Sequence, residues 1–122
     1  MRRATRFAIG LLLYAVALPV HAATITVTNT NDSGPGSLRQ ALANANNGDT
    51  INFAVTRTIA LTSGGLQVIK NTTISGPGAD HLSIYASQEW GPQATFHVVS
   101  GKTVTISGLT ITVGGFLMTK LY

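Results

Sequence analysis

Four carboxylic acids beyond residue 22 are the first candidates for chemistry in this chain: Asp32, Asp49, Asp80 and Glu89. Enzymes that cleave acidic polysaccharides use clustered carboxylates to hold calcium or for acid and base work. No two of these acids are close together in the sequence. Asp80 ends a Gly-Pro-Gly-Ala-Asp string that is typical of a turn, so we interpret it and Glu89 as solvated turn residues. The sequence predicts no catalytic residue.

A catalytic base and a metal site are two further alternatives. Arg57 could abstract a proton in a lyase cleft, but an isolated arginine at a corner is usually a solvated charge. His81 and His97 are the only histidines beyond residue 22, and the chain has no cysteine. With few acids near them, we predict no metal site and no cofactor. His97 alternates with Phe96 and Val98, which predicts that its imidazole points outward.

Two aromatic residues are the candidates for ligand binding. Trp90 stands in Glu89-Trp90-Gly91-Pro92, which reads as a loop, and Tyr85 ends the preceding apolar run. An aromatic pair of this kind could form a platform on which a sugar stacks, and exposed loops often carry binding residues. A Trp90 side chain folded back over the wall of the protein is the alternative. The expected partner is a glycan or another ligand on a host or cell surface.

The N-terminal residues predict export. Arg2, Arg3 and Arg6 precede an apolar stretch over 7–20 that is too short to span a bilayer, and small residues follow up to Ala22. We predict a signal peptide over 1–22, cleaved after Ala22, and a secreted or outer-membrane location on a bacterial cell surface. Cleavage lowers the net charge from +4 to +1, because five basic and four acidic residues remain. We therefore expect no nucleic-acid partner and no membrane span in the mature chain.

The elements that must position these residues are short strands. Alternating runs of three to six residues are separated by Gly, Asn, Ser and Pro, which favours strands over helices. The predicted strands cover Thr24–Thr28, Thr50–Val55, Thr58–Leu61, Leu66–Ile69, Thr72–Ile74, Leu82–Tyr85, Thr95–Val99, Thr103–Ile106 and Leu109–Val113.

One segment, Gly36–Gly48, has the pattern of a short amphipathic helix of about two to three turns. Ser37 can accept hydrogen bonds from the free amides of the first turn. Asn47-Gly48 can end the helix with a residue in the left-handed region. We predict that this serine and the apolar face of the helix form the cap of the fold, which consists of Ser37, Leu38, Ala41 and Leu42.

An internal repeat indicates how the strands are arranged. Residues 66–76 reappear, with two residues added, as residues 96–108, and both copies end in Ile-Ser-Gly. Repeats built from very short strands predict a solenoid in which each coil stacks on the one before. The offset of 32 residues between Ile74 and Ile106 is longer than a compact coil needs. The surplus is expected in residues 87–93, as a loop that bulges from one corner.

Three segments carry a resemblance to a known family. Ile25–Leu42, followed by Gly48–Phe53, resembles the opening of secreted bacterial right-handed parallel β-helix repeat proteins, and Thr103–Ile111 resembles the coil consensus of that family. The group lies within the pectate-lyase-like superfold and includes polymorphic outer-membrane and autotransporter-type adhesins. The resemblance covers nearly all of 24–114. It implies an all-β, right-handed parallel β-helix whose short N-terminal helix caps the first coil.

The organisation expected from these observations is a signal peptide over 1–22, a strand and capping helix over 23–48, and coils over 49–122. About three coils fit, near the minimum for a stable solenoid. We see no second cap after Gly114-Gly115, so we expect a truncated chain. An uncapped coil would expose apolar side chains and unpaired strand edges, which predicts self-association through the open C-terminal coil.

The function expected from the sequence is a non-catalytic extracellular β-helix module with a structural or adhesive role. The alternative is the N-terminal fragment of a polysaccharide lyase or glycoside hydrolase whose catalytic coils lie beyond residue 122. The acid content favours the first hypothesis, because a catalytic member should carry aspartates on adjacent coils. The fold argument is the stronger one, since function depends on sites that this stretch barely has.

Overall fold

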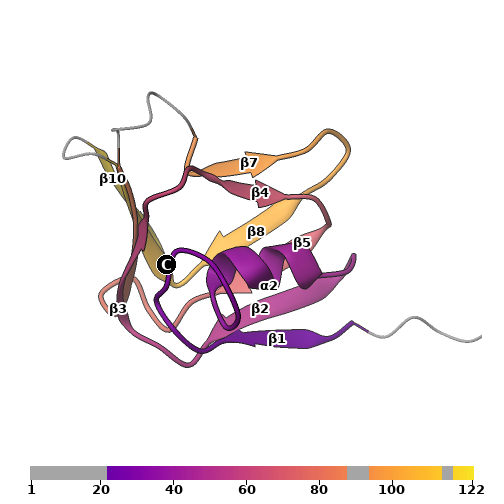
Figure 1. The fold of residues 1–122 in the computed structure, drawn as a ribbon, viewed down its shortest axis with the longest axis horizontal. Coiled ribbons are helices and arrows are strands. Elements are labelled where there is room, and N and C mark those ends of the chain that lie inside the picture. The colour runs from indigo at the N-terminus through magenta and orange to yellow at the C-terminus, as the bar shows by residue number, and fades with distance from the viewer. Residues whose placement is uncertain (1–21, 88–93, 114–116) are drawn as a thin grey trace, which may run out of the picture.

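The protein is a parallel β-solenoid of about three turns with one short helix near its N-terminal end (Figure 1). The computed structural model describes residues 22–87, 94–113 and 117–122, with backbone only for 117–120. In chain order the elements are β1 (Thr24–Val27), α2 (Leu38–Asn44), β2 (Asp49–Phe53), β3 (Arg57–Leu61), β4 (Leu66–Val68), β5 (Thr72–Ser75), β6 (Leu82–Ala86), β7 (Phe96–Val98), β8 (Val104–Ser107), β9 (Leu109–Val113) and β10 (Leu117–Leu121).

Three sheets form the walls of the solenoid. Sheet A has the order β1-β2-β5-β8, sheet B the order β10-β9-β6-β3, and sheet C consists of β4 and β7. Every pairing is parallel except that of β10 with β9. From β2 to β9, consecutive strands therefore belong to different sheets, and each strand pairs with its counterpart one coil away. The predicted β-helix and its nine strands are confirmed, with strand ends that differ by one or two residues.

The internal repeat found in the sequence corresponds to the register in which the strands of successive coils pair. Leu66 and Val68 of β4 are opposite Phe96 and Val98 of β7. Ile74 of β5 is opposite Ile106 of β8. A side chain that points inward on one coil is thus above an apolar side chain on the next, and stacked strands are about 4.8 Å apart. The extra residues of the second copy lie in the turn between β7 and β8.

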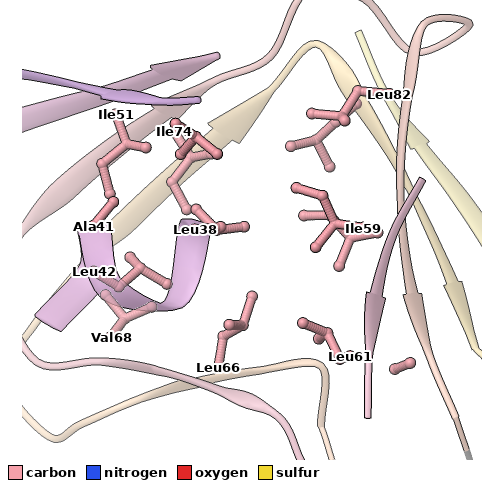
Figure 2. Close-up of a cluster of buried hydrophobic side chains, with 14 residues drawn as sticks. Leu38, Ala41, Leu42, Ile51, Ile59, Leu61, Leu66, Val68, Ile74 and Leu82 are labelled. Carbon is pink, nitrogen blue, oxygen red and sulfur yellow. The ribbon is translucent and has the colours of Figure 1, made fainter. Parts of the chain in front are cut away.

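The core fills the space between the three sheets. Figure 2 shows the apolar side chains of the sheets pointing toward a common interior, with those of α2 facing them. The labelled residues come from sheet A (Ile51, Ile74), sheet B (Ile59, Leu61, Leu82), sheet C (Leu66, Val68) and α2 (Leu38, Ala41, Leu42). Because alternate strand residues face inward, a chain without disulfides gains its burial from these ladders.

The helix begins as the sequence predicts and ends earlier. Ser37 is the N-cap, and its Oγ accepts a hydrogen bond from the amide of Gln40 at 3.1 Å. The helix stops at Asn44, where Ala45 is already extended with φ −67° and ψ 148°. The expectation that Asn47-Gly48 end the helix is therefore wrong. Gly48 does adopt a positive φ, of 93°, but it does so in the turn that leads into β2.

A strand that the sequence analysis missed follows the third coil. Leu117–Leu121 forms β10, which reverses direction and pairs antiparallel with β9 along the edge of sheet B. β8 and β7 remain the last strands of sheets A and C among the described residues. The short apolar run after Gly114-Gly115 gave no alternation strong enough to predict a strand. The edge that we expected to be open is thus covered in sheet B.

Candidate functional site

The corner between sheets B and C combines the features of a binding site. On the first coil it consists of residues 62–65, between β3 and β4, and on the second coil of residues 87–95, between β6 and β7. We call the described part of these two connecting segments, residues 62–65, 87, 94 and 95, the B–C corner; residues 88–93 lie outside the described residues. The amide of Leu66 donates to the carbonyl of Thr95 at 2.7 Å, so the two segments stay joined where sheet C begins.

Asp32, in the linker between β1 and α2, holds the first-coil side of this corner. Its carboxylate accepts hydrogen bonds from the amide of Thr62, at 3.1 Å, and from the hydroxyl of Ser63. Arg39 of α2 forms an ion pair with the same carboxylate at 2.9 Å. Burial alone would raise the pKa of Asp32, but the bonds from Ser63, Arg39 and Thr62 lower it to about 2. Asp32 is therefore a structural anion that ties the linker to the wall.

Arg39 extends this connection to the two glycines of the corner. Its Nη2 donates to the carbonyl of Gly64 at 2.8 Å and its Nη1 to that of Gly65 at 2.7 Å. Its Nε donates to the backbone carbonyl of Asp32 at 3.0 Å. Gly64 has φ +118°, and a Cβ on Gly65 would collide with the carbonyl oxygen of Ala94. One guanidinium and one carboxylate thus hold the backbone of the corner in place. We call this pair of side chains the Asp32–Arg39 strap.

A polar hollow of about 410 Å³ lies on the outer side of this backbone. Its lining comes from the first-coil turn and β4 on one side and from the second coil on the other: Ser63, Gly64, Gly65, Gln67, Ala94 and His97. Gln67 and His97 are partners in the β4–β7 register, and both are exposed. Two planar polar side chains therefore stand side by side, one coil apart, on the floor of an open site.

Tyr85 lies on the other flank of the same corner. It is 38% exposed and lines a second hollow of about 200 Å³ with Ala60, Leu61, Thr62 and Ser87. Tyr85 is therefore placed where a ligand at the corner could meet it. The other predicted ligand-binding residue, Trp90, lies outside the described residues. The structure thus brings one of the two aromatic candidates to this corner and adds Gln67, which the sequence analysis had not singled out.

The remaining candidates for chemistry are dispersed over the fold. Asp49 is buried, and hydrogen bonds from the amides of Ala23 and Asn46, both at 2.9 Å, lower its pKa. Asp80 and His81 belong to the turn before β6, and Arg57 begins β3 with an exposed side chain. Asp49 acts as a brace between the turn before β2 and the residue before β1. Glu89 lies outside the described residues.

The predicted cap residues lie at the N-terminal end of the core. Leu38, Ala41 and Leu42 are all buried and belong to the same apolar cluster as Ile51 and Leu66. Ser37 is fully buried, and its hydroxyl donates to the carbonyl of Gly34 at 2.7 Å. Seen along the view of Figure 1, α2 lies over the space that the three sheets enclose.

The residues that sequence reasoning missed are Gln67 and the Asp32–Arg39 strap. The internal repeat aligns Gln67 with His97, so the pairing of these two side chains was present in the sequence. Nothing in the sequence linked Asp32 to residue 63, because the contact joins segments 31 residues apart.

Comparison of the chain with protein-family models, with curated proteins and with solved structures finds no match in any of the three. Within residues 22–87, 94–113 and 117–122, no three His, Asp or Glu side chains come together in a group that could bind a metal ion. In the same part of the chain, no helix is long and apolar enough to cross a membrane.

Proposed function

We propose that this protein is a non-catalytic extracellular module with a structural or adhesive role, exported by a signal peptide that is cleaved after Ala22. It presents a rigid wall at a bacterial cell surface and binds a glycan or another surface ligand at the B–C corner. The resemblance of Ile25–Leu42 and Thr103–Ile111 to secreted bacterial right-handed β-helix repeat proteins supports this assignment. The parallel solenoid is the fold that the resemblance implies.

The observation that carries the proposal is the hollow at the B–C corner. Binding sites are concave and mostly formed before the ligand arrives, with a few polar groups that fix its orientation. The hollow of about 410 Å³ lies within the range of volumes found for ligand-binding pockets. The strap of Asp32 and Arg39 holds its backbone in place. A fixed backbone lowers the entropy lost when a ligand is bound.

The use of the acids supports a role in binding rather than in catalysis. General acid or base catalysis on a sugar needs a carboxyl group that can exchange its proton beside the substrate. The Asp32 carboxylate has an ion pair with Arg39 and two further hydrogen bonds, and Asp49 holds two backbone amides. Hydrogen bonds lower the pKa of both carboxyl groups. They are therefore suited to remain ionised and to stabilise the structure.

An adhesion experiment tests the proposal. The full chain is expressed in a bacterial host, its mature N-terminus is sequenced, and beads coated with the exported protein are offered to glycan arrays and to cells. We expect Ala23 as the first residue and retention of the beads. Gly65→Val should abolish retention, because the added side chain collides with Ala94, whereas Thr73→Ala, on the outer face of sheet A, should not change it.

Two results would contradict the proposal. Failure of the wild-type beads to bind any surface would remove the adhesive role. Release of unsaturated or reducing sugar from pectin would favour the alternative, a fragment of a polysaccharide lyase or glycoside hydrolase.

A further inference from the structure

We propose that the hollow at the B–C corner binds an uncharged sugar ring, with the side chains of Gln67 and His97 as its direct hydrogen-bonding contacts. The inference rests on the adhesive function proposed above and specifies the ligand of that site. It excludes acidic polysaccharides as the preferred ligand.

The polar groups on the floor of the hollow match the hydroxyls of a sugar. Gln67 offers an amide that both donates and accepts, and the imidazole of His97 offers two ring nitrogens. Neither side chain hydrogen-bonds another described residue. Gln67 and His97 are opposite each other in the β4–β7 register, so their strands carry them about 4.8 Å apart along the solenoid. Adjacent hydroxyls of one ring can therefore be contacted by both groups at once.

The charges around the hollow favour an uncharged ligand. The lining residues that the structure describes include no lysine and no arginine. Arg39 already donates to Asp32, Gly64 and Gly65 through all three of its guanidinium nitrogens. The carboxylate of Asp32 lies behind Ser63, whose hydroxyl it holds. A uronic acid would thus find no free cation to pair with among the described residues that line the hollow.

The walls of the hollow are built to stay open. Gly64 has open space where a side chain would stand, and Gly65 lies against the carbonyl of Ala94. Glycine at both positions therefore keeps side chains out of the hollow.

The test uses the exported protein labelled with ¹⁵N. Neutral oligosaccharides of glucose, mannose, galactose and xylose, and an oligogalacturonate as the acidic probe, are titrated while amide resonances are recorded. We expect at least one neutral oligosaccharide to shift the amides of Gly64, Gly65, Gln67 and His97. The amide of Thr73, on sheet A, should not move.

The variants Gln67→Ala and His97→Ala decide whether the side chains make the contacts. Each should weaken binding about tenfold, the loss expected for one hydrogen bond to the ligand. Both residues are exposed, so their unfolding midpoints should equal that of the control variant Thr73→Ala. Unchanged affinity in both variants would overturn the assignment of the contacts.

The outcomes separate this inference from the proposed function. The inference is wrong if no neutral oligosaccharide shifts the four amides, or if the oligogalacturonate binds more tightly. If the beads still adhere when both residues are substituted, the adhesive role remains, but it belongs to another surface. If the beads do not adhere at all, the adhesive function fails as well.

Discussion

Two corners of the solenoid are held by different kinds of hydrogen bond, although both join one coil to the next. The corner between sheets C and A consists of residues 69–71 and 99–103, and we call it the C–A corner. There the backbone amide of Asn71 donates to Asn47 Oδ1 on the preceding coil, and Asn71 Oδ1 accepts from the amide of Thr103 on the next coil, both at 2.9 Å. Successive coils are thus linked directly, coil to coil. At the B–C corner the bonds come instead from Asp32 and Arg39, which belong to the N-terminal linker and helix.

The difference shows how a repetitive fold obtains a site. The two segments of the C–A corner have three and five residues, whereas those of the B–C corner have four and nine. Similar lengths let side chains bridge the coils, and only a hollow of about 170 Å³ remains at the C–A corner. The hollow at the B–C corner has about 410 Å³. The B–C corner is held by Asp32 and Arg39, which lie outside its own two segments. The outward-facing side chains of β4 and β7 therefore remain available to a ligand.

Removal of the strap should have the largest effect. Asp32→Ala deletes an ion pair and two hydrogen bonds to the B–C corner and leaves Arg39 without its carboxylate. We expect the free energy of unfolding to fall by about 2–3 kcal/mol. Urea denaturation measures this loss. A change below about 0.5 kcal/mol, the effect expected for Thr73→Ala, would show that the strap does not support the corner.

Acid should weaken the same strap. The pKa of Asp32 is about 2 in the folded protein and near 3.8 in the unfolded chain. A carboxyl whose pKa is lowered by folding stabilises the protein above its unfolded pKa, and this contribution disappears as the pH falls through the folded value. We expect a loss of about 2 kcal/mol between about pH 4 and pH 2. Asp49, whose pKa is also lowered, acts in the same direction.

Urea midpoints recorded across this pH range, for the wild type and for Asp32→Ala, measure the contribution. The variant should lose less stability on acidification, because only the wild type carries the strap. Equal pH dependence in the two proteins would contradict the assignment.

At the C–A corner, Asn71→Ala should cost about 1 kcal/mol. The substitution removes the acceptor for the amide of Thr103, but the site is exposed and water can replace it. Hydrogen exchange is the informative measurement, because the amide of Thr103 should lose protection while that of Leu66, at the B–C corner, keeps it. Simultaneous loss at both amides would mean that the two corners do not act independently.

The smallest expected effect is a gain at the third corner, between sheets A and B. Arg57 has φ +85°, in the left-handed region that disfavours residues with a Cβ. Arg57→Gly should raise the free energy of unfolding by about 0.5–1 kcal/mol, since relief of strain exceeds the added freedom of the unfolded chain. Thermal denaturation checks the sign. A lower melting temperature would show that the arginine side chain contributes more than its backbone strain costs.

Much of the fold could be predicted because its signals are local. The alternation in β2 to β9 and the Ile-Ser-Gly repeat are read directly from neighbouring residues, and parallel stacking follows from them. The cap serine Ser37 was equally local. The end of the helix at Asn44 was not, because Ala45 is extended by the path that the chain takes toward β2 rather than by its own preference. β10 depends on pairing with β9, and its five residues carry no alternation of their own.

The candidate site was predicted only in outline. The sequence indicated an outward-facing His97, which the structure confirms, whereas the loop predicted over 87–93 lies outside the described residues except for Ser87. By itself, then, the amino-acid sequence determined which side chains face inward and which residues repeat, because a strand's period of two is a property of adjacent residues. Only the tertiary structure decided that Asp32 and Arg39 support the corner beneath Gln67 and His97, because contacts between segments some thirty residues apart depend on how the coils stack.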